Sequence, residues 1–229
     1  MEDLKSFYQL ESLGQSVPPG SSFARRSNQE VERHFLCTKY GEFFLPDAIR
    51  PSFDLQIIPR QGFRKDEYTD DCTGEIRPVI RAAVSRERLL DVFYDSLSLL
   101  GDTANVILEN SHADEQLPDN FHYYYREVID IPVLKSILMD YEDFLLSDGC
   151  TGLAAMHCEE FLEIHLDEHK LLVLYAEDAE IFDEIFIRNQ ILHDPQMPLI
   201  TDAEHVHVTR DKYQDLFRQL AQDLQMEAY

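Results

Sequence analysis

The sequence has few glycines and few basic residues, and both shortages exclude common classes of function. Its eight glycines form no GxGxxG, GxxxxGKS/T or GxSxG arrangement, so a dinucleotide fingerprint, a P-loop and a nucleophile elbow are all missing. Only 20 lysines and arginines oppose 44 acidic residues, which gives a formal net charge of −24. Such a charge repels nucleic acid and anionic membranes. We therefore expect neither a nucleic-acid partner nor a membrane partner.

Cysteines and long apolar runs are also scarce. The four cysteines, Cys37, Cys72, Cys150 and Cys158, show no CxxC or zinc-finger spacing. So few cysteines in a chain of 229 residues argue against a disulfide framework, and we interpret them as reduced, mostly buried thiols. The polar start of the sequence and the lack of a long apolar run predict no signal peptide and no membrane span. These features together predict a cytoplasmic protein.

The acidic residues are concentrated in the C-terminal two-thirds of the chain. Between Glu127 and Glu184, sixteen acidic residues are opposed only by Lys135 and Lys170. One interpretation is a surface that binds a basic protein. The other is a solvated surface that keeps the protein soluble, which includes the adaptation of a bacterial protein to high salt.

The pattern along the chain predicts an α+β protein of two regions. Residues 1–75 are expected to form an N-terminal region of helix, loop and β-hairpin, and residues 76–229 an α+β domain, with one continuous domain as the alternative. In the first region we expect a helix at 4–13, a hairpin at 34–45, a strand at 53–58 and a loop at 60–75.

The second region begins with alternating strand-like and helix-like segments. Ser85 precedes apolar residues at helical spacing, and Asp130 with Pro132 begins a second helix that ends near Gly149. The order βαββαβ predicts a ferredoxin-like core over about residues 76–158, with additional strands and helices at both ends. The C-terminal extension is expected to read ββαβα. The predicted core strands cover residues 78–84, 103–108, 121–128 and 151–158.

The run from His165 to His169 spells H-x-x-E-H, the pattern of inverted zinc metalloproteases. That chemistry needs both imidazoles on one face of a helix, with the glutamate beside them as a base. Here the flanking residues alternate like a hairpin, so we favour coincidence over a protease. Strand and turn structure over residues 160–170 would exclude the protease.

A looser site for a divalent metal is a separate hypothesis, although no motif requires a cofactor. On a strand, Glu163, His165 and Asp167 project to one face, and His205 and His207 also share a face. The other interpretation of each histidine is a surface or hydrogen-bonded side chain. The candidate metal ligands are His157, His165, His169, His205 and His207.

A cluster of aromatic and basic residues at 122–126 is a candidate for binding. Alternation along a strand puts Tyr123 and Tyr125 on one face and Arg126 on the other. Tyrosine and arginine are favoured in interfaces and pockets, while a solvated sheet face is the alternative interpretation. The candidate binding residues are Tyr123, Tyr125, Arg126, Glu159 and Glu160, and no catalytic residue is assigned.

The leading expectation is a cytoplasmic, bacterial protein that binds a basic protein through the acidic segment 127–184 and performs no catalysis. One alternative is a metal-binding protein or metal-dependent enzyme that uses the His/Asp/Glu-rich hairpin. Another is a structural, oligomeric subunit, such as a homodimer whose sheets pack face to face.

Overall fold

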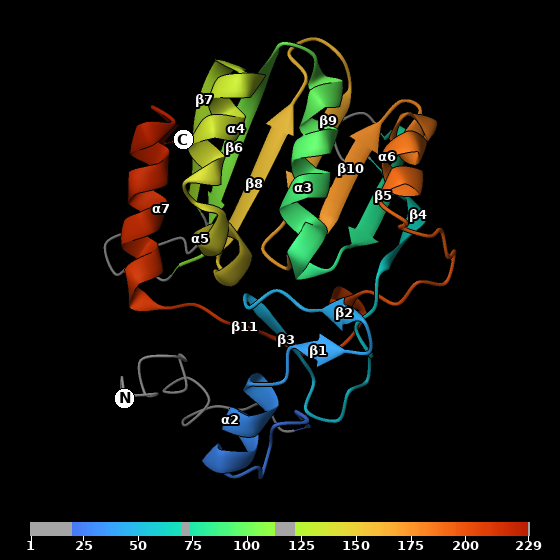
Figure 1. The fold of residues 1–229 in the computed structure, drawn as a ribbon, viewed down its shortest axis with the longest axis vertical. Helices are drawn as coiled ribbons and strands as arrows, with labels where there is room; N and C mark the ends of the chain where they lie inside the picture. The colour runs from blue at the N-terminus through green and yellow to red at the C-terminus, as the bar shows by residue number, and fades with distance from the viewer. Residues whose placement is uncertain (1–19, 70–73, 113–121, 229) are drawn as a thin grey trace.

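A large antiparallel sheet forms the centre of the computed structural model, which describes residues 20–69, 74–112 and 122–228 (Figure 1). Every pair of neighbouring strands in it is antiparallel. The expected α+β class is therefore confirmed. The eight strands lie in the order β12 (Glu227–Ala228), β7 (His122–Asp130), β6 (Thr103–Asn110), β8 (Thr151–Met156), β9 (Leu162–Leu166), β10 (Leu172–Ala176), β5 (Ile76–Ala83) and β4 (Gly62–Thr69).

Helices cover one face of this sheet (Figure 1). The strands alternate between buried and more exposed residues, so Ala104, Val106 and Leu108 of β6 all point into the same apolar core. Leu89 and Phe93 pack into that core from the helix at Arg86–Leu97 and have no exposed surface. Burying such side chains stabilises the fold by roughly 1.5–3 kcal/mol each. The covering helices are α3 (Arg86–Leu97), α4 (Ile131–Met139), α5 (Glu142–Ser147), α6 (Asp183–Arg188) and α7 (Asp211–Asp223).

A smaller unit lies at one end of the sheet, at the bottom of Figure 1. Its apolar residues form a second cluster with the side of the large sheet that faces away from the helices, where Val79 and Val173 meet Ile49 and Leu199. The second cluster thus joins the unit to the sheet. The unit consists of α2 (Asn28–Phe35), the hairpin β1 (Lys39–Tyr40) and β2 (Phe43–Phe44), and the pair β3 (Ile49–Pro51) and β11 (His205–His207).

A ferredoxin-like core over residues 76–158 is not confirmed. The strands β6, β7 and β8 neighbour one another as expected, but β9 and β10 lie between β8 and β5. The first strand of the expected plait therefore pairs with β10 and β4 and with none of the other three. The sequence pattern predicted the four core strands but not their pairing, because pairing depends on contacts between distant residues.

Four local expectations need correction. Residues 60–75, expected to form a loop, contain the strand β4. This strand lies at the edge of the sheet, where charged residues are common. Residues 53–58 form no strand, and the expected hairpin at 34–45 begins only at Lys39, because His34 and Phe35 end α2. The helix expected from Asp130 to Gly149 is interrupted at Asp140, where α4 ends. The expected helix at 4–13 lies outside the described residues.

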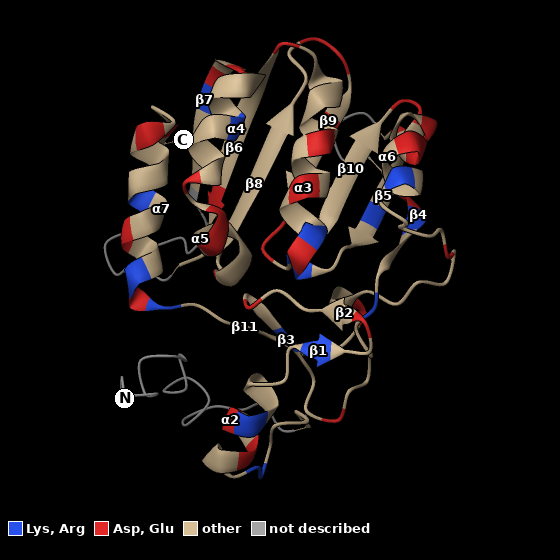
Figure 2. Cartoon of the chain, in the orientation of Figure 1, with Lys and Arg blue, Asp and Glu red and all other residues tan. Residues whose placement is uncertain are grey.

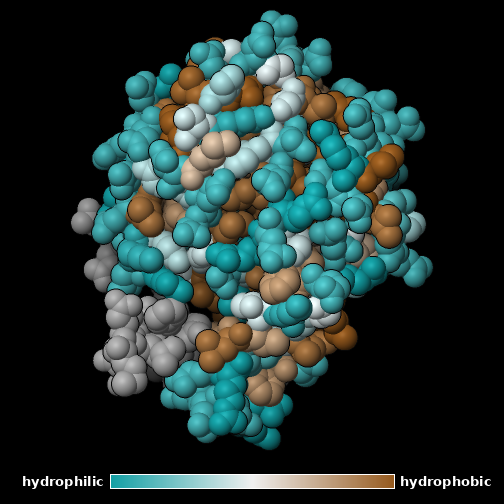
Figure 3. Space-filling model, in the orientation of Figure 1, coloured by the Kyte–Doolittle hydropathy of each residue, from teal (hydrophilic) through white to brown (hydrophobic). Residues whose placement is uncertain are grey.

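The outer sides of the helices carry much of the acidic charge. Figure 2 shows aspartate and glutamate along α3, α5, α6 and α7. In the same orientation the surface is mostly hydrophilic, with scattered hydrophobic spots (Figure 3). Within the described ranges, no helix combines the length and the apolar character that a membrane crossing requires.

Candidate metal centre

Three histidines from two separate parts of the chain meet where the small unit contacts the large sheet. His205 and His207 lie on β11, which pairs with β3, and alternate residues of a strand project to the same side. His169 lies in the tight turn between β9 and β10. In that turn Lys170 adopts a positive φ of 60°, a conformation that costs energy for a residue other than glycine and is common at functional sites.

The three rings face one another closely. The ring centroid of His169 lies 5.0 Å from that of His205 and 4.7 Å from that of His207. The rings of His205 and His207 are 5.3 Å apart, and one ligand nitrogen from each ring lies within 4.8 Å of the other two. Nitrogens that share a tetrahedral zinc ion at its usual bond length are about 3.3 Å apart.

Each of these rings is oriented by an oxygen acceptor at Nδ1. His169 contacts Oδ2 of Asp167 at 3.0 Å, and His205 contacts the carbonyl oxygen of Ala203 at 2.8 Å. His207 contacts the carbonyl oxygen of Gly149. Because these oxygens accept hydrogen bonds, Nδ1 is the donor in each ring, and a metal would bind at Nε2. Histidines that bind metals are held in this way by carboxylates and carbonyls.

The electrostatic surroundings of the three rings differ. Burial disfavours the imidazolium of His169, but the hydrogen bond and charge of Asp167 outweigh burial and raise its pKa. Burial lowers the pKa of His207, and the neighbouring rings of His169 and His205 lower it further, against the opposing effect of the Gly149 carbonyl. The arrangement thus favours a neutral, ligating ring at His207.

A carboxylate lies beside the three rings. Oε2 of Glu168 accepts a hydrogen bond of 3.0 Å from Oγ of Ser111, and its negative charge acts on both His169 and His207. Three imidazoles next to a carboxylate suit zinc-class transition metals rather than Mg²⁺ or Ca²⁺, which prefer oxygen ligands.

Gly149 allows the small unit to approach the sheet closely. Its N–H donates to the carbonyl oxygen of Val208, and the N–H of Val208 donates to that of Ala48, both at 2.8 Å. A Cβ atom at position 149 would lie 2.3 Å from the Ala48 oxygen, so only glycine fits. This contact places the Gly149 carbonyl against the ring of His207.

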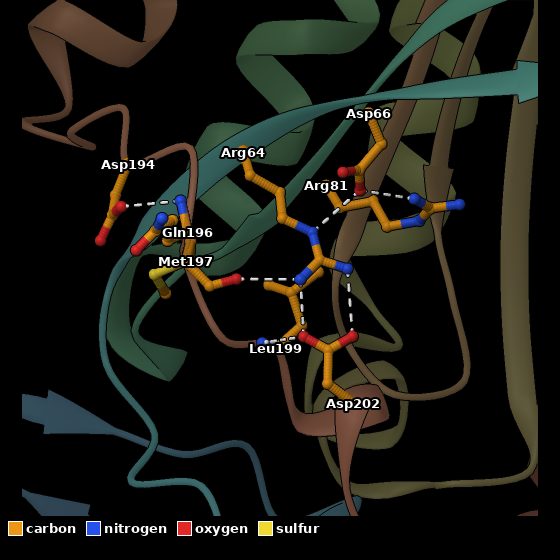
Figure 4. A network of polar contacts seen from close by, with 8 residues as sticks. All are labelled: Arg64, Asp66, Arg81, Asp194, Gln196, Met197, Leu199 and Asp202. Atoms are coloured by element: carbon orange, nitrogen blue, oxygen red, sulfur yellow. Dashed lines mark hydrogen bonds and ion pairs between the residues drawn. The ribbon is translucent and has the colours of Figure 1, made fainter.

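An arginine network holds the segment that leads into β11 (Figure 4). Arg64 of β4 donates two hydrogen bonds to the carboxylate of Asp202, at 2.6 and 3.1 Å, and a third to the carbonyl oxygen of Met197. Its Nε donates to Asp66, which also accepts from Arg81. The network fixes residues 197–202 on the sheet, a few residues before His205.

Two of the five predicted metal ligands lie elsewhere. Nε2 of His165 donates to Oε2 of Glu109 at 3.1 Å, on the sheet face opposite the helices. Nδ1 of His157 accepts the N–H groups of Glu159 and Glu160 in the turn after β8. The structure therefore brings together His169, His205 and His207 and leaves His157 and His165 apart from them.

The H-x-x-E-H run is not helical. Strand β9 ends at Leu166, and the residues from Asp167 to Lys170 form the turn before β10. The two histidines of the run consequently do not share a helix face. This geometry excludes the inverted metalloprotease arrangement, although His169 itself belongs to the centre.

The predicted binding residues lie on β7 and in the turn after β8. Tyr123 pairs in register with Glu109, and Tyr125 with Ile107. Arg126 turns toward the end of α7, where it donates to the carbonyl of Leu224 and the side chain of Gln225. The predicted residues Glu159 and Glu160 are exposed in the turn after β8.

A second cluster of ligand-type residues is not indicated by the sequence. His112, Asp148 and Cys150 have ligand atoms within 4.8 Å of one another. Nε2 of His112 contacts Oδ2 of Asp148 at 2.8 Å, and Thr209 donates to Oδ1 at 2.6 Å. His112 follows β6, whereas Asp148 and Cys150 precede β8, so no short spacing in the sequence indicates this cluster.

Comparison with known proteins adds no relative to this picture. No protein-family model matches the chain, and no curated protein or solved structure matches it either. The function is therefore argued from the side chains of the site itself.

Proposed function

We propose that this protein binds a divalent zinc-class metal ion through Nε2 of His169, His205 and His207. The observation that carries the proposal is the common orientation of the three rings. In each ring Nδ1 donates to an oxygen, and one ligand nitrogen from each ring lies within 4.8 Å of the other two. A hydrogen bond at the other ring nitrogen is the arrangement that most metal-binding histidines show.

The centre supports water activation better than a purely structural role. Structural zinc sites have four protein ligands, while catalytic sites have three and keep a fourth position for water or substrate. Here three imidazoles converge, and Glu168 lies beside them with its carboxylate held by Ser111. A zinc ion held by these residues would supply an activated water for the hydrolysis of carbonyl or phosphoryl groups. We infer a centre of the hydrolytic type.

We propose metal binding as the function in place of the binding of a basic protein, which the composition had led us to expect. The acidic helices in Figure 2 fit that partner, but high surface charge also serves solubility alone. The basic partner and the homodimer remain predictions. Three imidazoles that converge have fewer explanations than an acidic surface has. We therefore base the proposed function on the imidazoles.

Titration calorimetry with zinc tests the proposal on chelator-stripped protein. The wild type is expected to bind a tight equivalent that His169→Ala, His205→Ala or His207→Ala each weakens by at least about 100-fold, since each variant removes one of three ligands. His157→Ala is the matched control and should bind as the wild type does. Equal affinity in all variants, or no binding to the wild type, would overturn the proposal.

A further inference from the structure

A buried cluster with a different ligand set lies next to the histidine centre, in the segment around Gly149. His112 and Asp148 are almost fully buried, with exposed fractions of 7% and 0%. With the thiol of Cys150, they present an imidazole nitrogen, a carboxylate oxygen and a sulfur atom within 4.8 Å of one another. From these residues we propose a second metal site, which takes a zinc-class ion through His112, Asp148 and Cys150.

The two sites are joined by one short segment. Asp148 and Cys150 flank Gly149, the residue whose carbonyl oxygen accepts the hydrogen bond from His207. Glu168 acts electrostatically on both Cys150 and His207. The second ion shares no ligand with the first, so the site goes beyond the proposed function while lying next to it.

The ligand chemistry suits a soft or borderline ion. Thiolate and imidazole favour zinc and its neighbours over Mg²⁺ and Ca²⁺. The carboxylate is oriented in advance, because Thr151 and Thr209 donate to its two oxygens. Donors of this kind, outside the ligand set, commonly fix the carboxylates that bind metals.

Metal uptake at this site requires the loss of hydrogens that are now in place. Nε2 of His112 lies 2.8 Å from Oδ2 of Asp148; when this nitrogen binds the ion, its hydrogen leaves and the ring carries its hydrogen on Nδ1. The thiol of Cys150 binds the ion as a thiolate. Its proton is released to solvent as the sulfur–metal bond forms.

Cobalt(II) titration followed by absorption tests this proposal, because thiolate-bound cobalt gives a sulfur-to-metal charge-transfer band in the near ultraviolet. The wild type should bind two equivalents and develop the band. Cys150→Ser should lose the band and one equivalent. His207→Ala should lose the other equivalent and keep the band. The control Cys158→Ala removes an exposed thiol and should behave as the wild type does.

The other outcomes separate the two proposals. One equivalent without a thiolate band overturns the second site and leaves the histidine centre standing, in which case the cluster is a hydrogen-bond network alone. A band that survives in Cys150→Ser and disappears in Cys158→Ala also overturns the second site. Absence of cobalt binding overturns both sites. Circular dichroism of each variant establishes that it is folded.

Discussion

His207 donates its Nδ1 hydrogen to the carbonyl oxygen of Gly149, a residue 58 positions earlier in the chain. This contact links the β3–β11 pair to the segment that enters β8. It also fixes which nitrogen of His207 faces the other two imidazoles. The proposed centre therefore depends on how closely the two parts of the molecule approach each other.

The close approach at Gly149 can be tested by adding one methyl group. Gly149→Ala places a Cβ 2.3 Å from the Ala48 oxygen, so backbone must shift. We expect the free energy of unfolding to fall by about 1–3 kcal/mol and zinc affinity to fall with it. Chemical denaturation and calorimetry measure both. Gly41→Ala meets no atom within 4 Å but strains a φ of 62°, so it is the control that should lower stability and leave zinc affinity unchanged. An equal loss of zinc affinity in both variants would contradict the account.

Asp167, whose carboxylate contacts Nδ1 of His169, is expected to increase metal affinity without binding the metal itself. Asp167→Asn replaces an acceptor of the His169 hydrogen bond by a weaker one and removes its charge. We expect zinc affinity to drop by about 10- to 100-fold, measured by competition with a chelator. Glu163→Gln makes the same chemical change on β9, away from the three rings, and should leave affinity unchanged. If both variants bind zinc as the wild type does, Asp167 has no such role.

The pair of His165 and Glu109 should make stability depend on pH. Burial opposes the imidazolium, but the hydrogen bond and charge of Glu109 prevail and raise the pKa of His165. A raised pKa in the folded state means that this stabilisation is complete below the unfolded value of about 6.5 and is lost as pH rises through the folded value.

Urea unfolding across this pH window, on the metal-free protein, tests the relationship. The difference in unfolding free energy between wild type and His165→Gln should shrink as pH rises from about 5.5 to 8.5. Glutamine keeps a donor near the position of Nε2 but does not titrate. A difference that stays constant with pH, or that grows, would show that His165 does not gain its charge on folding.

The arginine network in Figure 4 should stabilise residues 197–202, the segment that precedes β11. Arg64→Lys keeps the charge but loses the paired contacts to Asp202. We expect a loss of about 1 kcal/mol in the free energy of unfolding, since the pair is partly solvent-exposed. The exposed pair of Arg218 and Asp215 provides the control Arg218→Lys, which should change stability very little. Similar thermal unfolding of both variants would rule out a special role for Arg64.

The sequence predicts the elements of this fold better than their arrangement. Apolar residues at helical spacing, such as Leu89 and Phe93, indicate α3, and alternation indicates β6 and β9. The position of β9 and β10 between β8 and β5 has no local signal. It arises from packing between segments that lie far apart in the chain.

The same limit applies to the centre. The pattern of His205 and His207 on a strand indicated a shared face, and His169 was recognised within a turn. Their meeting depends on the contact of β11 with the β9–β10 turn, which no spacing in the sequence encodes. Cys150 was interpreted only as a buried thiol, because its neighbours His112 and Asp148 become visible only in three dimensions.

The most direct test of the histidine centre is zinc-edge X-ray absorption of the Cys150→Ser variant loaded with one equivalent of zinc. This variant leaves the histidine centre as the proposed site. The account predicts a zinc ion with three imidazole ligands at about 2.0–2.1 Å and a pattern that is lost in the additional variant His207→Ala. A zinc ion surrounded by oxygen alone, or an imidazole pattern unchanged by His207→Ala, would contradict it.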